Sequence, residues 1–165
     1  MGAPRVDRPL SPYGTELAAV CALLNEHGAR YVLFGARAMQ LWGTTRATRD
    51  IDILIEPTVE NARLVLAALS HLGLGLADEW LADELSNRPV TVIGDSPRVD
   101  VFTVMWSVRY AEAAAHARVF VLEHVHIPTA SIEHLIASKR TGRLQDAADI
   151  EVLEEIKRLR EDPRR

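Results

Sequence analysis

The segment FGARAMQLWGTTRATRDIDILI, from Phe34 to Ile55, decides the fold and raises its main chemical question. Two acids, Asp50 and Asp52, stand at the start of an otherwise aliphatic run. This alternation predicts a strand in which the two carboxylates point to the same face. On a largely buried strand they repel, and each raises the pKa of the other unless a cation lies between them. We therefore expect this strand to hold a cation.

The first half of the segment predicts an anion site. Gly35 follows the apolar run RYVLF and precedes ARAMQLW, a short helix that we expect to end at Gly43. A helix N-terminus presents free N–H groups and a positive dipole end, and glycine allows a phosphate to approach the main chain. We expect Gly35 and Ala36 to bind phosphate through main-chain N–H groups, and Thr48 to orient the loop before the acids. Taken alone, such a glycine is usually a turn and an Asp-x-Asp pair usually a solvated strand edge.

A third acid repeats the pattern later in the chain. Asp100 lies within RVDVFTV, and the turn DSP separates this run from PVTVIG, which predicts a hairpin. If the strand of Asp100 neighbours that of Asp52, carboxylates converge at one edge. Such a cluster suits one or two Mg²⁺ ions held together with substrate phosphates. Asp50, Asp52 and Asp100 are therefore the predicted metal ligands and catalytic residues.

The remaining elements indicate an α+β fold with a mixed sheet. We expect residues 1–14 to form a flexible arm and 15–162 a single domain whose part from about 129 to 162 is helical, with a break at Thr141-Gly142. Other predicted elements are helices over 15–27, 57–73 with Thr58 as N-cap, and 107–117, a short helix or lid over 77–85, and a strand pair over 118–122 and 124–128.

Composition narrows the classes of function. The chain has 165 residues, 48% of them hydrophobic, a net charge of −4 and a pI near 5.9, which argues against a wholly basic nucleic-acid-binding surface. The single cysteine, Cys21, lies on an apolar helical stripe, so we expect a buried thiol. The sequence contains neither an apolar run of about 18 residues nor a signal-peptide pattern, so the expected location is the cytoplasm, away from membranes.

In order and setting, Phe34-Gly35-Ala36, Asp50-Ile51-Asp52 and Asp100 resemble the motifs of the nucleotidyltransferase superfamily, which has a polymerase-beta-like fold. Arg46, Thr48 and the two acids after them match the form R-x-T-x-D-x-D of its minimal bacterial branch. That branch includes AbiEii-type toxins and small antibiotic nucleotidyltransferases, and the tail SKRTGRLQDAADIEVL is similar to theirs. The resemblance covers about residues 17–153. One departure is Ala36, which stands where the family usually has Gly or Ser and retains the N–H but lacks a hydroxyl.

The resemblance implies a nucleotidyltransferase fold, a mixed β-sheet flanked by helices with a C-terminal helical pair. It implies magnesium-dependent transfer of a nucleoside monophosphate from a triphosphate to an acceptor hydroxyl, on RNA such as a tRNA 3′ end, on a protein or on a small molecule. A toxin acting with a cognate antitoxin is the favoured setting. The alternative is a non-catalytic module on the same fold that binds nucleotide or protein.

Further residues receive roles with alternatives left open. Arg46 and Lys139 are candidates to contact the triphosphate, and each is nearly as well explained as a surface cation. Asp146 and Asp149, one helical turn apart, are expected to support the pocket by pairing with Lys139, Arg140 or Arg143. His124 and His126 alternate on a predicted strand but lack further zinc ligands. Three tryptophans are candidates to stack on a base, although core packing is favoured for the first: Trp42, Trp80 and Trp106.

Overall fold

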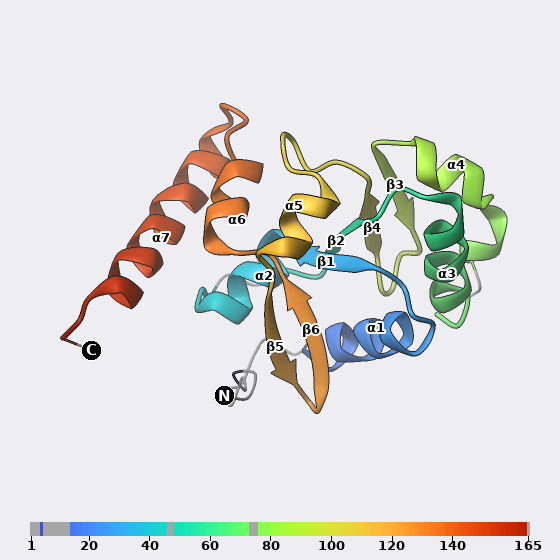
Figure 1. Cartoon of the computed structure of the whole chain (residues 1–165), viewed down its shortest axis with the longest axis horizontal. Coiled ribbons are helices and arrows are strands. Elements are labelled where there is room, and N and C mark those ends of the chain that lie inside the picture. The colour runs from blue at the N-terminus through green and yellow to red at the C-terminus, as the bar shows by residue number, and fades with distance from the viewer. Residues whose placement is uncertain (1–3, 5–13, 46–47, 73–75, 165) are drawn as a thin grey trace.

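The fold is a mixed six-stranded sheet with helices around it, as predicted (Figure 1). The computed structural model describes residues 4, 14–45, 48–72 and 76–164. The strand order is β3-β4-β2-β1-β6-β5. Pairing is antiparallel within β1/β2, β3/β4 and β5/β6, and parallel in β2/β4 and β1/β6. The strands are β1 Tyr31–Phe34, β2 Ile51–Ile55, β3 Val90–Ile93, β4 Val99–Phe102, β5 Arg118–Leu122 and β6 Val125–Thr129.

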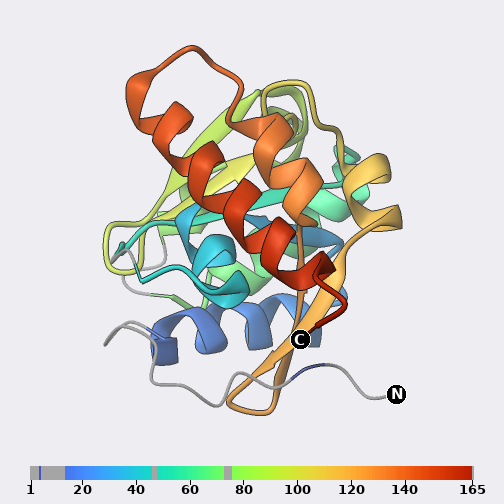
Figure 2. The same ribbon diagram turned by 90° about the vertical axis from the view of Figure 1, so that its left-hand side faces the viewer.

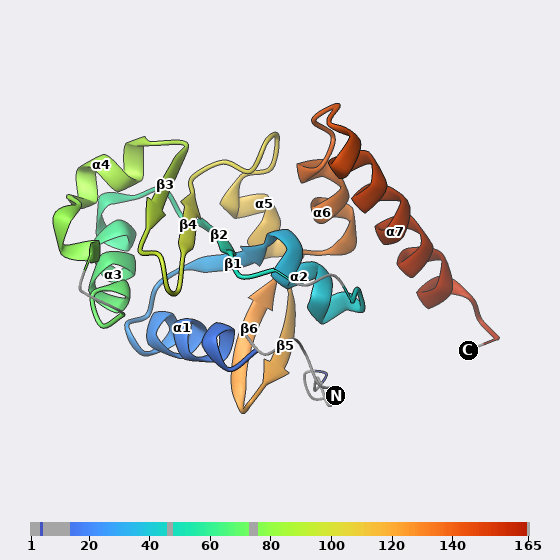
Figure 3. The ribbon, with the colours of Figure 1, turned by 180° about the vertical axis from the view of Figure 1, so that it is seen from behind.

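Helices cover the central strands from both sides. In Figures 1 and 3 α1 lies below β1 and α5 lies above it, while α6 and α7 pack together at one end of the molecule, the end that faces the viewer in Figure 2. All four residues of β1 are accordingly buried. The helices are α1 Gly14–Glu26, α2 Gly35–Trp42, α3 Val59–Leu69, α4 Ala82–Asn87, α5 Tyr110–Ala115, α6 Ile132–Ser138 and α7 Leu144–Glu161, with a 3₁₀ helix η1 at Leu76–Glu79. In the described ranges no helix is long and apolar enough to span a membrane.

Local signals in the sequence set several boundaries. The Thr58 side chain accepts a hydrogen bond from the Asn61 N–H and caps α3, as predicted. Gly43 ends α2. Cys21 is buried, and burial raises the pKa of its thiol to about 12. Trp42 packs in the core, where its ring nitrogen donates to the Ala130 carbonyl at 2.8 Å.

Some predicted boundaries are wrong. β2 begins at Ile51, so Asp50 lies just before the strand and is exposed. His124 is not in a strand, because it forms the β5–β6 turn with a φ of 68°, and it therefore does not share a strand face with His126. The helix predicted to reach residue 73 ends at Leu69.

Other predicted segments differ only in detail or lie beyond the described residues. The segment predicted as one short helix over 77–85 divides between η1 and α4. Gly14, assigned to the arm, is the first residue of α1. Apart from Pro4, whose carbonyl accepts from the Val121 N–H at 2.9 Å, the rest of the arm lies outside the described residues.

Candidate functional site

The sheet places two of the three predicted acids side by side. β2 and β4 run parallel, and their register sets Asp52 directly opposite Asp100. On its other side Asp52 is opposite Phe34, the residue that precedes α2. The apolar residues on either side of the two acids are buried, and a one-residue slip of either strand would turn its buried face outward. The register that buries the core therefore also forms this pair of carboxylates.

Gly35 lets Asp52 approach the start of α2. Its φ of +68° lies in the left-handed region that favours glycine. A Cβ at this position would lie 2.9 Å from Cγ of Asp52 and closer still to its Oδ2. Both the backbone conformation and the neighbouring carboxylate therefore require glycine here. Ala36 follows in the first turn of α2, where it is partly buried.

The negative charge of the Asp52 carboxylate is only partly compensated by nearby cations. Its burial, reinforced by the charges of Asp100 and Asp50, raises its pKa to about 6, although Lys139 and Arg98 act in the opposite direction. Among the described residues, no hydrogen bond or ion pair reaches this side chain. A carboxylate held in this way is a strong acceptor for an added cation.

Asp100 is held by a residue that the sequence analysis missed. Arg98 donates from Nε to Oδ1 of Asp100 at 2.9 Å and from Nη2 to Oδ2 at 3.2 Å. The Arg98 side chain is 43% exposed, whereas that of Asp100 is 12% exposed. The i, i+2 spacing was the available signal, because such residues share a face of a strand.

The donor set suits magnesium, although it is not arranged as a closed cage. In residues 4, 14–45, 48–72 and 76–164, no three His, Cys, Asp or Glu side chains lie close enough together to hold one ion. Mg²⁺ commonly takes one or two carboxylates and completes its shell with water and substrate phosphates. Asp52 and Asp100 meet that requirement once Arg98 releases Asp100.

A second charged cluster joins α6 to α7. Lys139 ends α6, and its Nζ lies 2.8 Å from Oδ2 of Asp149 and 3.7 Å from Oδ1 of Asp146. Arg143 Nε donates to Asp146 at 2.8 Å, and the Thr141 hydroxyl donates to the same carboxylate. Burial favours protonation of Asp146, but these two hydrogen bonds and the charge of Lys139 outweigh it and lower its pKa. Of the three predicted partners, Lys139 and Arg143 pair with these acids, whereas Arg140 makes no ion pair with either acid among the described residues.

One cavity brings the two clusters together. It has a volume of about 240 Å³, and both Asp52 of β2 and Lys139 of α6 line it. This volume is below the ~300–1,000 Å³ typical of pockets that bury a whole drug-sized ligand. The cavity can therefore enclose part of a nucleotide-sized molecule. The other lining residues are Gly35, Phe102, Met105, Trp106, Ser138, Thr141, Arg143 and Asp146.

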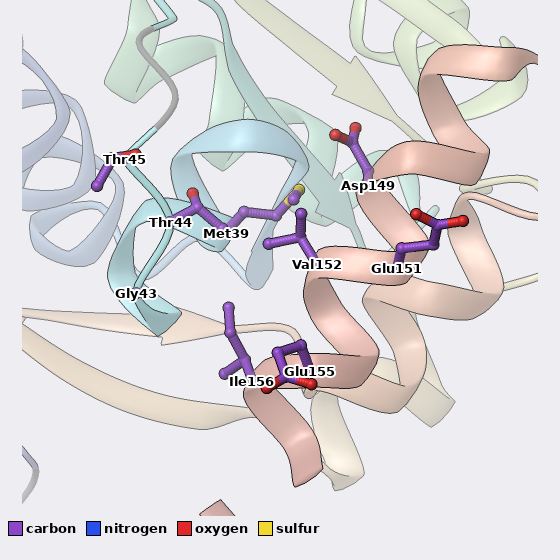
Figure 4. Close-up of a pocket in the computed structure, with 9 residues that line it drawn as sticks. All are labelled: Met39, Gly43, Thr44, Thr45, Asp149, Glu151, Val152, Glu155 and Ile156. Atoms are coloured by element: carbon purple, nitrogen blue, oxygen red, sulfur yellow. The ribbon is translucent and has the colours of Figure 1, made fainter. Parts of the chain in front are cut away.

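A larger cavity lies between the end of α2 and the middle part of α7 (Figure 4). Its volume is about 500 Å³. Figure 4 shows Val152 of α7 facing Met39 of α2 across it. Asp149 also lines this cavity, so the Lys139–Asp149 ion pair connects the two cavities. The remaining lining residues are Gly43, Thr44, Thr45, Glu151, Glu155 and Ile156. Of this set, only Asp149 and Gly43 have a role predicted from the sequence.

The loop before the acids is only partly described. Arg46, a predicted phosphate contact, lies outside the described residues. Thr48 is partly buried, and its carbonyl accepts a hydrogen bond from Nη1 of Arg37 at 3.0 Å. Arg37 is 1% exposed, so a buried guanidinium holds this loop from inside the fold. No role for Arg37 was predicted from the sequence.

Comparison with known proteins supports the fold. The chain is similar to the crystal structure of a "putative nucleotidyltransferase" from Thermotoga maritima, with a TM-score of 0.55 and 15% sequence identity over 93% of this chain and 94% of that chain. The predicted nucleotidyltransferase-like fold is therefore confirmed. No protein-family model matches the sequence, and no curated protein matches it. The toxin-type branch thus stays a prediction.

Proposed function

We propose that this protein is a magnesium-dependent nucleotidyltransferase that moves a nucleoside monophosphate from a triphosphate to an acceptor hydroxyl and releases pyrophosphate. The observation that carries the proposal is the pairing of Asp52 with Asp100 across parallel strands, directly beside the glycine that opens α2. The paired carboxylates, whose charge nearby cations only partly balance, thus lie beside the N-terminus of α2, which is suited to bind phosphate. The fold similarity to the Thermotoga maritima protein agrees with this reaction class.

The proposed roles follow from charge and position. Asp52 and Asp100, with Asp50 at the edge, would hold one or two magnesium ions, which when bound stabilise charge on the attacking and leaving oxygens. Gly35 and Ala36 would donate main-chain N–H groups to the triphosphate. In addition to ligating metal, Asp100 would accept the proton of the acceptor hydroxyl as it attacks the α-phosphorus.

The cations around the cavity have separate roles in this proposal. Lys139 lines the same cavity as Asp52 and would contact the triphosphate as a point charge while Asp149 holds it in place. Arg46 would add a second cation from the loop. Asp146 would support Lys139 and Arg143 without contacting substrate. Thr48, fixed by Arg37, would orient the loop that leads to Asp50.

The proposed acceptor is a hydroxyl on RNA, on a protein or on a small molecule, and the proposed setting is a toxin with a cognate antitoxin. Expression in bacteria should then slow growth, and Asp52→Asn should relieve the inhibition. Unimpaired growth at a verified level of the wild-type protein would argue against the toxin setting and leave the reaction class standing.

The reaction is tested by incubating the purified protein with magnesium, a cell extract and each of four labelled triphosphates. Wild-type protein should transfer label, and Asp52→Asn should lower the rate by a factor on the order of 10³, because a metal ligand is lost at the reacting phosphate. Asp78→Asn is the matched control, since Asp78 is an exposed acid on η1. Full transfer by the Asp52 variant would contradict the proposal.

A non-catalytic nucleotide-binding module is the second candidate, and the bidentate hold of Arg98 on Asp100 favours it. Ala36 adds to this reading, because a serine hydroxyl is lost there. Calorimetry with a triphosphate and magnesium distinguishes the two functions. Tight binding combined with no transfer to any extract component would favour the module over the enzyme.

A further inference from the structure

Trp106 occupies a turn that its side chain does not favour. Met105 and Val108 exchange two hydrogen bonds, from Met105 N–H at 2.9 Å and from Val108 N–H at 3.0 Å, which closes a tight turn over Trp106 and Ser107. Trp106 has a φ of 57°, in the left-handed region where bulky L-residues are rare. Glycine is the usual residue at the first central position of a tight turn with positive φ. The turn itself therefore gives no reason for a tryptophan.

Packing gives no reason either. Trp106 is 62% exposed, whereas Trp42 is 7% exposed in the core. Trp80 is partly buried and has the Arg88 guanidinium 4.9 Å from its ring centroid. In the part of the chain that the structure describes, no aromatic ring or cation stacks on Trp106. Its ring is thus available to a molecule from outside the fold.

The ring belongs to the cavity that contains Asp52. Phe102, Met105 and Trp106 give this cavity an apolar wall, and Asp52 and Lys139 give it a charged one. A ligand that matches both walls has a flat apolar part joined to an anionic part that binds cations. Nucleotides have this composition, and every base has a π-face that can stack on an indole ring.

We propose that Trp106 is the platform on which the base of the bound nucleotide stacks. This inference rests on the function proposed above, and it assigns the base of the substrate to the apolar wall of the cavity. The phosphates then lie toward Lys139 and Gly35. Stacking on an exposed ring reads the π-face and not the hydrogen-bonding edge, so all four bases bind, with purines favoured by their larger area. Loss of the ring weakens nucleotide binding by about 5- to 150-fold.

The test is equilibrium titration with a non-hydrolysable nucleoside triphosphate and magnesium, followed by calorimetry and by tryptophan fluorescence. Wild-type protein binds with quenching of its emission. Trp106→Phe retains affinity within about threefold and loses most of the quenching, because a phenyl ring also stacks. Trp80→Phe is the matched control. It should change neither the affinity for the nucleotide nor the loss of Trp106 emission that binding causes.

Trp106→Gly separates binding from folding. Glycine adopts the left-handed turn without strain, so this variant should melt at or above the wild-type temperature and still bind the nucleotide more weakly. Inorganic tripolyphosphate, which lacks a base, should bind the variant and the wild type equally. Unchanged nucleotide affinity in Trp106→Gly overturns the inference, as does an equal loss of tripolyphosphate binding.

The outcomes also separate this inference from the proposed reaction. Nucleotide binding that depends on Trp106, found together with no nucleotidyl transfer, leaves the base platform standing and removes the enzymatic function. If Trp106→Gly transfers the nucleotide with the wild-type KM, the enzymatic function stands and the base platform is wrong. If the wild-type protein binds no nucleotide at all, both proposals are wrong.

Discussion

Asp52 and Asp146 line the same cavity, and the fold treats their carboxylates in opposite ways. Asp146 receives hydrogen bonds from Thr141 and Arg143 and has Lys139 nearby, and its pKa is lowered. Asp52 receives no such contact from the described residues, and its pKa is raised to about 6. Ionisation of a carboxyl group favours folding when hydrogen bonds and cations in the fold satisfy the charge, and it opposes folding when burial leaves the charge unsatisfied.

Under the proposed function, this difference would distinguish the supporting residues from those that meet substrate. The α6–α7 cluster is complete without any ligand, which fits its proposed role of holding Lys139 in place. The acids on β2 and β4 have fewer partners, because among the described residues Asp100 has a single, exposed partner and Asp52 has none. Strain and unsatisfied charge concentrate at functional sites, and both Asp52 and the left-handed Trp106 follow that pattern.

The largest expected effect comes from adding a methyl group beside each cluster. Gly35 and Gly142 both have positive φ, at +68° and +85°, but a Cβ at Gly35 would collide with Asp52, whereas a Cβ at Gly142 meets nothing within 4 Å. Gly142→Ala should lose about 1 kcal/mol of unfolding free energy from backbone strain. Gly35→Ala should lose about 3 kcal/mol, because Asp52 must also move. Denaturant unfolding measures both, and equal losses would contradict the close approach of Asp52 to α2.

The next effect is a pH dependence of opposite sign for the two acids. Asp52 has a folded pKa near 6, above the usual value of 3.8. The folded protein therefore loses stability as the pH rises from 3.8 to about 6, because Asp52 then ionises less readily in the folded state than in the unfolded state. Asp52→Asn should therefore be more stable than wild type by about 1–3 kcal/mol at pH 7, and the gain should vanish below pH 4. Asp146 has a lowered pKa, so its charge stabilises the fold above the ordinary carboxyl pKa.

Asp146→Asn should consequently be less stable than wild type by about 1–3 kcal/mol at pH 7, because Lys139 and Arg143 lose a charged acceptor. That loss should shrink as the pH falls below the ordinary pKa of an aspartate. Chemical denaturation of the three proteins between about pH 2.5 and pH 8 measures both curves. Stability differences of the same sign in the two variants would remove the contrast between the acids.

Sequence alone predicted the elements whose causes are local. The alternation around Asp52 and Asp100 indicated two strands, and the turn between residues 93 and 99 indicated the β3–β4 hairpin. Thr58 marked the start of α3 for the same reason, because an N-cap acts on the next three residues. The pairing of β2 with β4 remained a condition in the sequence analysis, since strand order depends on contacts far apart in the chain.

The rest depends on tertiary packing or on side-chain rotamers. The Lys139–Asp149 contact was one of several pairings that helical spacing allowed, and the packing of α6 on α7 selects it. The larger cavity lies between Met39 and Val152, which no local pattern relates. The salt bridge of Arg98 depends on the rotamer of an exposed side chain, and the left-handed φ of Trp106 appears where the sequence has no glycine to signal it.

Asp100 lies between the two extremes, and it supports the smallest prediction. Its partner Arg98 is 43% exposed, so the pair is weak and the guanidinium can leave without losing burial. If these carboxylates bind magnesium as proposed, Arg98→Gln removes a cation that would compete with it for the same carboxylate oxygens. The magnesium concentration that half-saturates thermal stabilisation at pH 7 should then fall by about two- to fivefold, while Arg158→Gln, which removes an exposed pair with Glu155 on α7, should leave it unchanged. A rise in that concentration would mean that Arg98 assists the metal site, in which case Asp100 belongs with Asp146 among the satisfied acids and Asp52 alone awaits a cation.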